Sequence, residues 1–249
     1  MSRISPSHGG RSRAPARGSR PDPHPQPLAS RREQTGRGTD RIQDEAELDE
    51  YLTRPRPILM EFIRTVSSPL LVLGAGGKMG PTLAVLAKRA AEAARHRLEV
   101  IAVSRFSDRA ARRWLEQRGI GTISADLLQR REVEKLPDTS ELIYLVGLKF
   151  GTQQNPSLTW AVNTLVPAFV MERYPKARVA ALSTGNVYPL VPARSRGAGE
   201  DAPLTPLGEY ANAAVARERV FEHFSRQNGT RLALLRLNYA VELRYGVLA

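Results

Sequence analysis

A glycine-rich segment directly after an apolar run constrains the fold more than any other feature of this chain. The run Leu70–Gly74 predicts a buried strand, and an amphipathic helix is expected over Pro81–Arg95. Between them the chain must turn sharply, and side chains there would hold the backbone away from a phosphate at the helix N-terminus. Strand, glycine-rich turn and helix in this order predict a dinucleotide site. The residues expected to hold its pyrophosphate are Gly74, Gly76, Gly77, Lys78, Met79 and Gly80.

Apolar runs and amphipathic stretches alternate along the rest of the chain. Further strands are expected at Leu98–Ser104, Gly121–Ser124, Glu141–Gly147, Arg178–Thr184 and Arg231–Leu237. Further helices are expected at Asp108–Arg118, Leu158–Tyr174 and Leu207–Gln227. Strands rich in Val, Ile and Leu, each followed by a helix, indicate a parallel sheet covered on both faces. The sequence therefore predicts an α/β fold over residues 69–249, a Rossmann-type doubly wound parallel sheet with helices on both faces.

The first 40 residues have a different composition. Residues 1–41 hold nine arginines against three acidic residues, which is half of the chain's net charge of +12. This segment is rich in proline, glycine and serine and has almost no large apolar side chain, so we expect a disordered tail over residues 1–40. A basic arm for nucleic acid is an alternative, but the segment has no Tyr or Phe to stack on bases, so nucleic acid is not the expected partner. The start is also similar to a transit peptide, although its prolines would break an amphipathic helix.

Residues 41–68 carry acidic and apolar residues at helical spacing, interrupted at Pro55 and Pro57. This pattern predicts two short helices leading into the fold.

Composition excludes several classes of protein. No stretch approaches the roughly 18 apolar residues that a membrane span needs. There is also no apolar run near Met1 that could serve as a secretory signal. We therefore expect a cytoplasmic protein without membrane contact. The chain has no cysteine and four histidines, so neither a metal site nor a thiol nucleophile is expected.

Residues at the ends of the second and third strands bear on the kind of dinucleotide. An acidic residue after the second strand would bind the ribose 2′-hydroxyl of NAD, but this chain has Ser104 and Arg105 there. A small polar residue followed by a cation suits a 2′-phosphate, so the expected cofactor is NAD(P), with a preference for NADP. The alternative is that Arg105 is a solvated loop charge, and the nearby Asp108 weakens the argument. Asp126, followed by Leu127, could accept a hydrogen bond from the adenine or cap the next turn.

From about Pro69 onward the chain resembles the extended short-chain dehydrogenase/reductase family, the NAD-dependent epimerase/dehydratases that act mostly on nucleotide sugars. The resemblance rests on the spacing of Gly74, Gly77 and Gly80, on Asp126-Leu127, on Gly147-Leu148-Lys149-Phe150-Gly151, on Val162-Asn163-Thr164, and on Ser183-Thr184-Gly185-Asn186-Val187-Tyr188. It implies that Val146, Gly147, Lys149 and Asn163 contribute to the cofactor site. It also implies that the Thr184 hydroxyl binds the substrate oxygen.

The resemblance further implies a catalytic base that also contacts the cofactor. Tyr210 lies 26 residues after Thr184, a separation that suits the family, and Glu218 stands where the family often has an acid. A tyrosine has an unperturbed pKa near 10 and must be made more acidic to act at neutral pH. The family achieves this with a lysine four residues later, one helical turn on. In this chain that position is Ala214, so the expected lysine is missing.

Three interpretations of Ala214 stay open. In the first, Lys149, in the loop after the fourth strand, supplies the missing charge. The protein would then be an NAD(P)-dependent epimerase/dehydratase or oxidoreductase acting on a sugar-like or nucleotide-sugar substrate. Its catalytic residues would be Thr184, Tyr210 and Lys149. Alternatively, the protein binds NAD(P) without turnover, as a sensor or scaffold. In the third interpretation Tyr210 is simply a core residue of its helix.

The end of the chain bears on completeness. Asn238–Gly246 is similar to the segment of the family where a smaller substrate lobe begins, and the chain stops soon after it. Apolar residues at Tyr245, Val247 and Leu248 favour a fragment, so we expect a C-terminally truncated protein. In the resembling family, helices at the positions of residues 158–174 and 207–227 form a dimer interface, which implies a homodimer.

Overall fold

The apolar runs form one parallel sheet. In the computed structural model, which describes residues 42–238 and residue 243, six strands pair in the order β3-β2-β1-β4-β5-β6. They are β1 (Leu70–Leu73), β2 (Val100–Ser104), β3 (Gly121–Ser124), β4 (Glu141–Tyr144), β5 (Arg178–Thr184) and β6 (Arg231–Leu237). This confirms the predicted doubly wound parallel sheet. The predicted tail of residues 1–40 and the apolar residues at 245, 247 and 248 lie outside the described residues.

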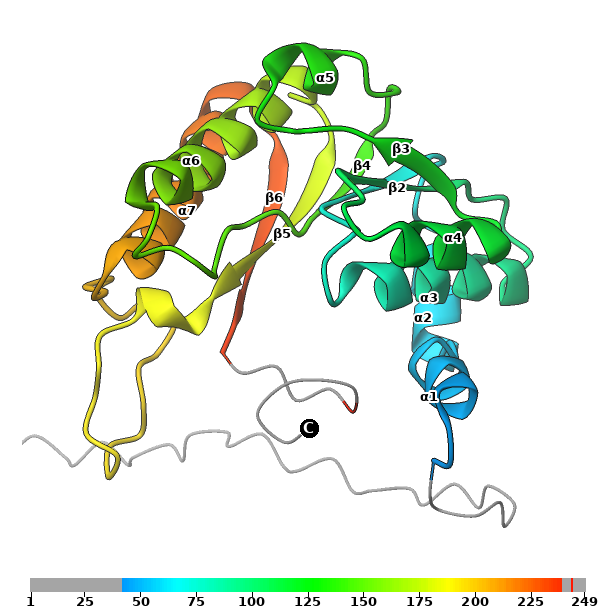
Figure 1. Ribbon diagram of the computed structural model, residues 1–249, viewed down its shortest axis with the longest axis horizontal. Helices are drawn as coiled ribbons and strands as arrows, with labels where there is room; N and C mark the ends of the chain where they lie inside the picture. Colours follow the sequence, from blue (N-terminus) through cyan, green and yellow to red (C-terminus); the bar gives the residue numbers. More distant parts are fainter. Residues whose placement is uncertain (1–41, 239–242, 244–249) are drawn as a thin grey trace, which may run out of the picture. The chain divides into compact units, whose positions relative to one another are not determined.

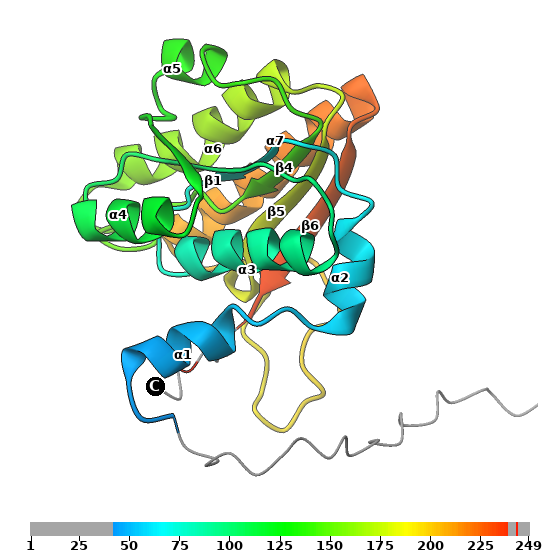
Figure 2. The same cartoon turned by 90° about the vertical axis from the view of Figure 1, so that its right-hand side faces the viewer.

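Helices cover the sheet on both sides. They are α1 (Glu45–Leu52), α2 (Pro57–Ile63), α3 (Gly80–Ala93), α4 (Arg109–Gln117), α5 (Arg130–Glu134), α6 (Pro156–Arg173) and α7 (Glu209–Asn228), with a 3-10 turn, η1, at Gly185–Val187. α6 and α7 lie on one face, and α3 and α4 on the other (Figure 1). The view turned by 90° shows the strands between α6 and α3 (Figure 2). The two short helices expected before the sheet are α1 and α2, whereas α5 and η1 were not predicted.

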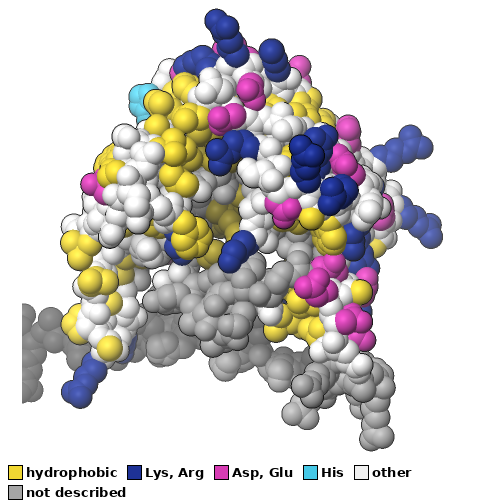
Figure 3. Space-filling model, in the orientation of Figure 1, with side chains coloured by type: hydrophobic (Ala, Val, Ile, Leu, Met, Phe, Trp, Pro, Cys, Tyr) yellow, Lys and Arg dark blue, Asp and Glu magenta, His cyan; other side chains and the backbone are white. Residues whose placement is uncertain are grey.

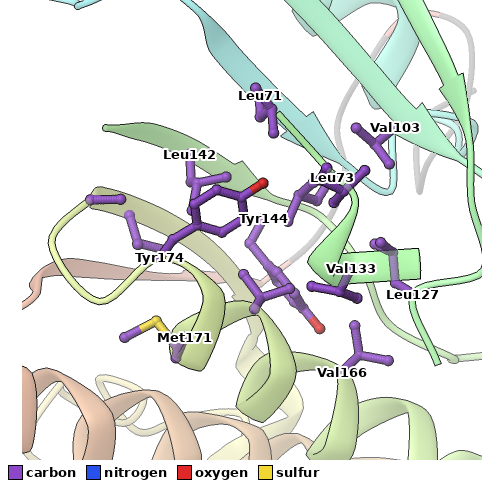
Figure 4. Close-up of a cluster of buried hydrophobic side chains, with 14 of the residues drawn as sticks. Leu71, Leu73, Val103, Leu127, Val133, Leu142, Tyr144, Val166, Met171 and Tyr174 are labelled. Carbon is purple, nitrogen blue, oxygen red and sulfur yellow. The ribbon is translucent and has the colours of Figure 1, made fainter. Parts of the chain in front are cut away.

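Alternating side chains of the central strands build two cores. Leu71 and Leu73 of β1 pack with Val103 and Tyr144 on the α6 side (Figure 4). Leu70 and Val72, whose side chains point to the opposite face of the sheet, pack on the α3 side. All four β1 residues are buried, as a central strand of a parallel sheet requires. Each such aliphatic side chain contributes about 1.5–3 kcal/mol by leaving water.

The strand order fixes where a ligand can bind. β1 lies between β2 and β4 and pairs with both in parallel register. The connections from these strands run in opposite directions across the sheet, so the loops at their carboxyl ends separate and leave a crevice. The expected strand Glu141–Gly147 ends earlier, at Tyr144, and the next residue still bonds to the end of β1. There the Leu145 N–H donates to the Leu73 carbonyl oxygen at 2.8 Å.

Candidate functional site

A cavity of about 470 Å³ lies at the carboxyl ends of β1, β2, β3 and β4. Nine of the residues expected to hold a cofactor line it: Gly74, Gly76, Gly77, Ser104, Arg105, Asp126, Leu127, Val146 and Gly147. Leu128, Leu158, Val162 and Val166 add an apolar wall. The face shown in Figure 3 is hollowed in its middle, and Lys and Arg side chains stand around the hollow. The structure therefore brings together five segments that are separated in the sequence.

The glycine turn lets the backbone come close to its neighbours. Gly74 has a φ of +82°, and a Cβ there would lie 2.9 Å from the Val146 backbone nitrogen. Gly80 begins α3, and a Cβ at this position would overlap the Ala75 backbone. The turn and the first residues of α3 are thus held against β1 and the loop after β4. Gly74, Gly76 and Gly77, which precede α3, line the cavity, so α3 begins beside it.

Gly76 offers a test of this wall. A Cβ at Gly76 would lie 2.6 Å from Ser104 Oγ and 3.1 Å from Ser104 Cβ. We expect Gly76→Val to weaken NADPH binding about tenfold or more, because the branched side chain fills the cavity beside Ser104. Calorimetric titration measures the loss. Gly121→Ala is the matched control, since its Cβ would find only ordinary contacts, at 3.6 Å and 3.7 Å, outside the cavity. Equal affinity in Gly76→Val and the wild type would show that the ligand does not enter here.

The end of β2 carries a group of arginines. Arg105 borders the main cavity and a smaller one that is lined by Phe106, Arg109, Arg112, Arg113 and Ser124. Asp108, the residue that weakened the cofactor argument, caps α4 and accepts from the Ala110 N–H at 2.7 Å. Arg112 is engaged with Glu116 at 2.8 Å. Positive charge therefore prevails where β2 ends.

Asp126 and Leu127 have structural roles as well as a place in the cavity wall. One Asp126 carboxylate oxygen accepts from the Leu128 N–H at 3.1 Å, which is the turn cap that the sequence left open. The Asp126 N–H donates to Glu132 at 2.6 Å. Leu127 is 6% exposed and belongs to the core on the α6 side.

The remaining predicted site residues do not line this cavity. Lys149 is exposed in the loop after β4, and Asn163 is completely buried in α6, where it donates to the carbonyl oxygens of Leu148 (3.3 Å) and Thr159 (2.9 Å). Lys78 precedes α3, Met79 is its N-cap and Gly80 is its first residue, and none of the three is part of the lining. In the part of the chain that is described, no hydrogen bond joins Lys149 to Tyr210.

Thr184 and Tyr210 lie in elements that contact each other. Thr184 ends β5, is buried, and its Oγ1 accepts from the Asn186 N–H at 3.2 Å, which starts η1. Tyr210 is the second residue of α7 and is half-buried; α7 packs against η1. Glu209, beside Tyr210, accepts from Trp160 Nε1 at 2.6 Å and ties the start of α7 to α6.

A network beneath η1 fixes these elements. Glu218 is fully buried in α7 and accepts from the Ser183 hydroxyl and from Arg236, whose Nη2 lies 2.7 Å from Glu218 Oε2. Arg236 also donates to the Tyr188 hydroxyl at 2.9 Å. The hydrogen bond with Glu218 raises the pKa of Arg236 above its usual range. One carboxylate thereby joins α7, β5, β6 and the segment after η1.

Sequence reasoning missed Arg217, a buried cation in α7. Its Nη1 donates to Asn163 Oδ1 at 2.9 Å and to the Val146 carbonyl oxygen at 3.3 Å. Among residues 42–238 and 243, no carboxylate lies within ion-pair distance of its guanidinium. The available signal was helical spacing, because Arg217 follows Ala214 by three residues.

The strand order and the cavity at its switch point define a Rossmann-type dinucleotide-binding fold. The model of the NAD dependent epimerase/dehydratase family matches residues 70–241, and the chain belongs to this family. A search of curated proteins gives no match. No helix in residues 42–238 is long and apolar enough to cross a membrane.

Several solved structures share the fold. The UDP-Glc/GlcNAc 4-epimerase from Campylobacter jejuni is 20% identical over 68% of this chain and 53% of its own, with a TM-score of 0.58. The UDP-glucuronic acid 4-epimerase from Bacillus cereus, in complex with NAD, is 21% identical over 68% and 56%, with a TM-score of 0.56. The UDP-glucose 4-epimerase from Brucella ovis, in complex with NAD, is 18% identical over 68% and 51%, with a TM-score of 0.58. This chain spans about half the length of these proteins.

Proposed function

We propose that this protein is an NAD(P)-dependent epimerase/dehydratase that acts on a nucleotide sugar. The observation that carries the proposal is the cavity at the β1/β4 switch point, where the glycine turn meets the ends of β2, β3 and β4. Family membership agrees with it, and the structures of similar fold include 4-epimerases of UDP-sugars. In the proposed domain organisation, residues 1–40 form a tail, residues 41–68 form a helical segment before the sheet, and residues 69–249 form the cofactor-binding domain.

The residues present fit a dinucleotide. Gly74 and Gly76 have no side chain to cover the backbone before the N-terminus of α3, where a pyrophosphate would accept hydrogen bonds from N–H groups. Ser104 and Arg105 would face the adenosine ribose, and Asp126 with Leu127 the adenine, since they border the same cavity at the ends of β2 and β3. Val146 and Gly147 would border the nicotinamide end.

Tyr210 and Thr184 supply the proposed proton chemistry. A bound nicotinamide cofactor would supply the acceptor and donor for a hydride at a sugar carbon. In our proposal Tyr210 takes the proton of the attached hydroxyl and later gives it back, while the Thr184 Oγ1 holds that oxygen. Contact between α7 and η1 keeps the two residues in neighbouring elements. Lys149 has the proposed assisting role, and because it is exposed, solvent screens its charge.

Product analysis tests the proposed reaction. The purified protein is incubated with NAD⁺ or NADP⁺ and with UDP-glucose, UDP-glucuronic acid or UDP-N-acetylglucosamine, and the sugar is examined by NMR. We expect a C4 epimer or a keto sugar from at least one of them. Cofactor binding without any change in these sugars would favour the second candidate, a catalytically silent NAD(P)-binding sensor or scaffold. The observation that supports this second candidate is Ala214, which stands in place of the family's lysine.

We further propose a preference for NADP, supported by the arginines around the end of β2. A 2′-phosphate beside Arg105 would also lie near Arg109 and Arg113, which line the adjoining cavity. The double variant S104D/R105A is expected to shift the ratio of NADP to NAD affinity toward NAD by about tenfold to a hundredfold, because it removes a forked cation and adds a like charge. Titration with both cofactors measures the ratio. Arg131→Ala removes an exposed cation elsewhere and should leave the ratio unchanged; an unchanged ratio in S104D/R105A would refute the preference.

The proposed homodimer involves α6 and α7. Trp160 and Leu165 of α6 are 38% and 46% exposed, and Leu207 before α7 is 73% exposed. Large apolar side chains exposed along one helix are typical of an interface. We propose that the protein forms a homodimer through α6 and α7 and that it is located in the cytoplasm.

A further inference from the structure

We propose that Arg217 supplies, from the next turn of α7, the positive charge that is missing at position 214. The inference rests on the proposed function, because it assigns Arg217 to the nicotinamide end of the proposed cofactor site. It adds a buried source of positive charge to the exposed Lys149. Arg217 acts here as a positioning residue for the cofactor and for the loop after β4.

Helix geometry places the Arg217 side chain over the position of the absent lysine. Ala214 and Arg217 are three residues apart in α7 and therefore lie on the same face of the helix. Long helical side chains lean toward the N-terminus and cover the turn before their own Cα. For Arg217 that turn contains Ala213 and Ala214, both completely buried and small enough to leave room. A cation rooted at 217 can thus reach the space that a lysine at 214 would fill.

The contacts of Arg217 show that its head reaches the cavity wall. Nη1 lies 2.9 Å from Asn163 Oδ1 and 3.3 Å from the carbonyl oxygen of Val146. A Cβ on Gly147 would lie 2.6 Å from Nη1. Val146 and Gly147 both line the cavity, so the guanidinium lies directly behind the end of β4. Asn163, which the resemblance assigned to the cofactor site, accepts from this guanidinium and donates to the Leu148 carbonyl oxygen.

Burial makes this charge effective. Arg217 is 4% exposed, whereas Lys149 is exposed to solvent, which screens its charge. The structure gives Arg217 no carboxylate partner among the described residues, so none of the described carboxylates neutralises its charge. Its field is felt nearby: burial raises the pKa of Tyr144, at the end of β4, and Arg217 acts in the opposite direction. A buried cation without a partner is costly, and an anionic or hydroxyl-rich ligand in the adjoining cavity would offset that cost.

Cofactor affinity tests the inference without reference to turnover. NAD⁺ and NADP⁺ are titrated calorimetrically into the wild type, R217Q, R217K and the double variant A214K/R217Q. We expect R217Q to bind roughly tenfold to a hundredfold more weakly. R217K and A214K/R217Q should bind within about threefold of the wild type, because each restores a cation at the same place. R219Q is the control: Arg219 is exposed in the same helix and pairs with Glu222, and its loss should leave the affinity unchanged.

Rescue separates a charge effect from a packing effect. A lysine at position 214 cannot reproduce the Arg217 hydrogen bonds, so recovery in A214K/R217Q supports the proposed charge. Folded R217Q with wild-type affinity, or folded A214K/R217Q that stays as weak as R217Q, would overturn it. If R217Q does not fold by circular dichroism, A214K/R217Q is compared directly with the wild type, and a loss of about tenfold overturns the inference. Absence of sugar turnover in the wild type would refute the proposed function alone, since these affinity ratios do not depend on it.

Discussion

Tyr210→Phe is expected to lower the turnover of the nucleotide sugar by about 10²–10⁴-fold, the usual contribution of a positioned acid or base. The change removes one hydroxyl from a half-buried residue at the start of α7 and leaves the ring in place. Stability should therefore change little. Cofactor affinity should change little as well, because the cavity wall lies at the ends of β1 to β4.

Steady-state kinetics of Tyr210→Phe, with the sugar that the wild type converts, measures this effect. Tyr51→Phe is the matched control, since Tyr51 lies in α1 with 57% of its surface exposed. Near wild-type turnover in Tyr210→Phe would remove Tyr210 from the mechanism. It would favour the interpretation in which this tyrosine is only part of the helix face.

Glu218→Ala is expected to lower the free energy of unfolding by about 3–5 kcal/mol, the range for removing one member of a buried ion pair. Glu218 is completely buried and accepts from Arg236 Nε at 3.0 Å and Nη2 at 2.7 Å, as well as from Ser183. Its loss leaves Arg236 without a carboxylate partner at the junction of β5, β6 and α7. The Thr184 end of β5 should loosen first.

Urea denaturation of Glu218→Ala beside Glu222→Ala checks this prediction. Glu222 lies one turn further along α7 and pairs with Arg219, whose side chain is 58% exposed, so its loss should cost less than about 1 kcal/mol. A cost below about 1 kcal/mol for Glu218→Ala as well would show that the network does not stabilise this junction.

The sheet could be predicted from the sequence because its strands are short, apolar and regularly separated by helices. Burial on both faces leaves β1 without a polar residue, so the strand stands out in the sequence as a continuous apolar run. α5 was missed because its five residues carry two arginines and two glutamates around Val133 and show no amphipathic period. The end of β4 was placed three residues too late, because Leu145 and Val146 are apolar like the strand but line the cavity beyond its end.

The cavity wall was also predictable in large part, since residues that follow the strands of a parallel sheet gather at one edge. Sequence alone could not show that Asn163 turns inward to Arg217, or that Asp108 is occupied as a helix cap. Both depend on which side chains the packed helices bring together. Arg217 itself was hidden, because a cation in an amphipathic helix ordinarily faces solvent.

Titration of NADPH, followed by its fluorescence, tests most directly whether the β1/β4 cavity is a dinucleotide site. The wild type should increase the emission of NADPH saturably at submillimolar concentrations, and Gly76→Val should require at least about tenfold more. Unchanged emission at millimolar NADPH and NADH with the folded wild type would contradict the account.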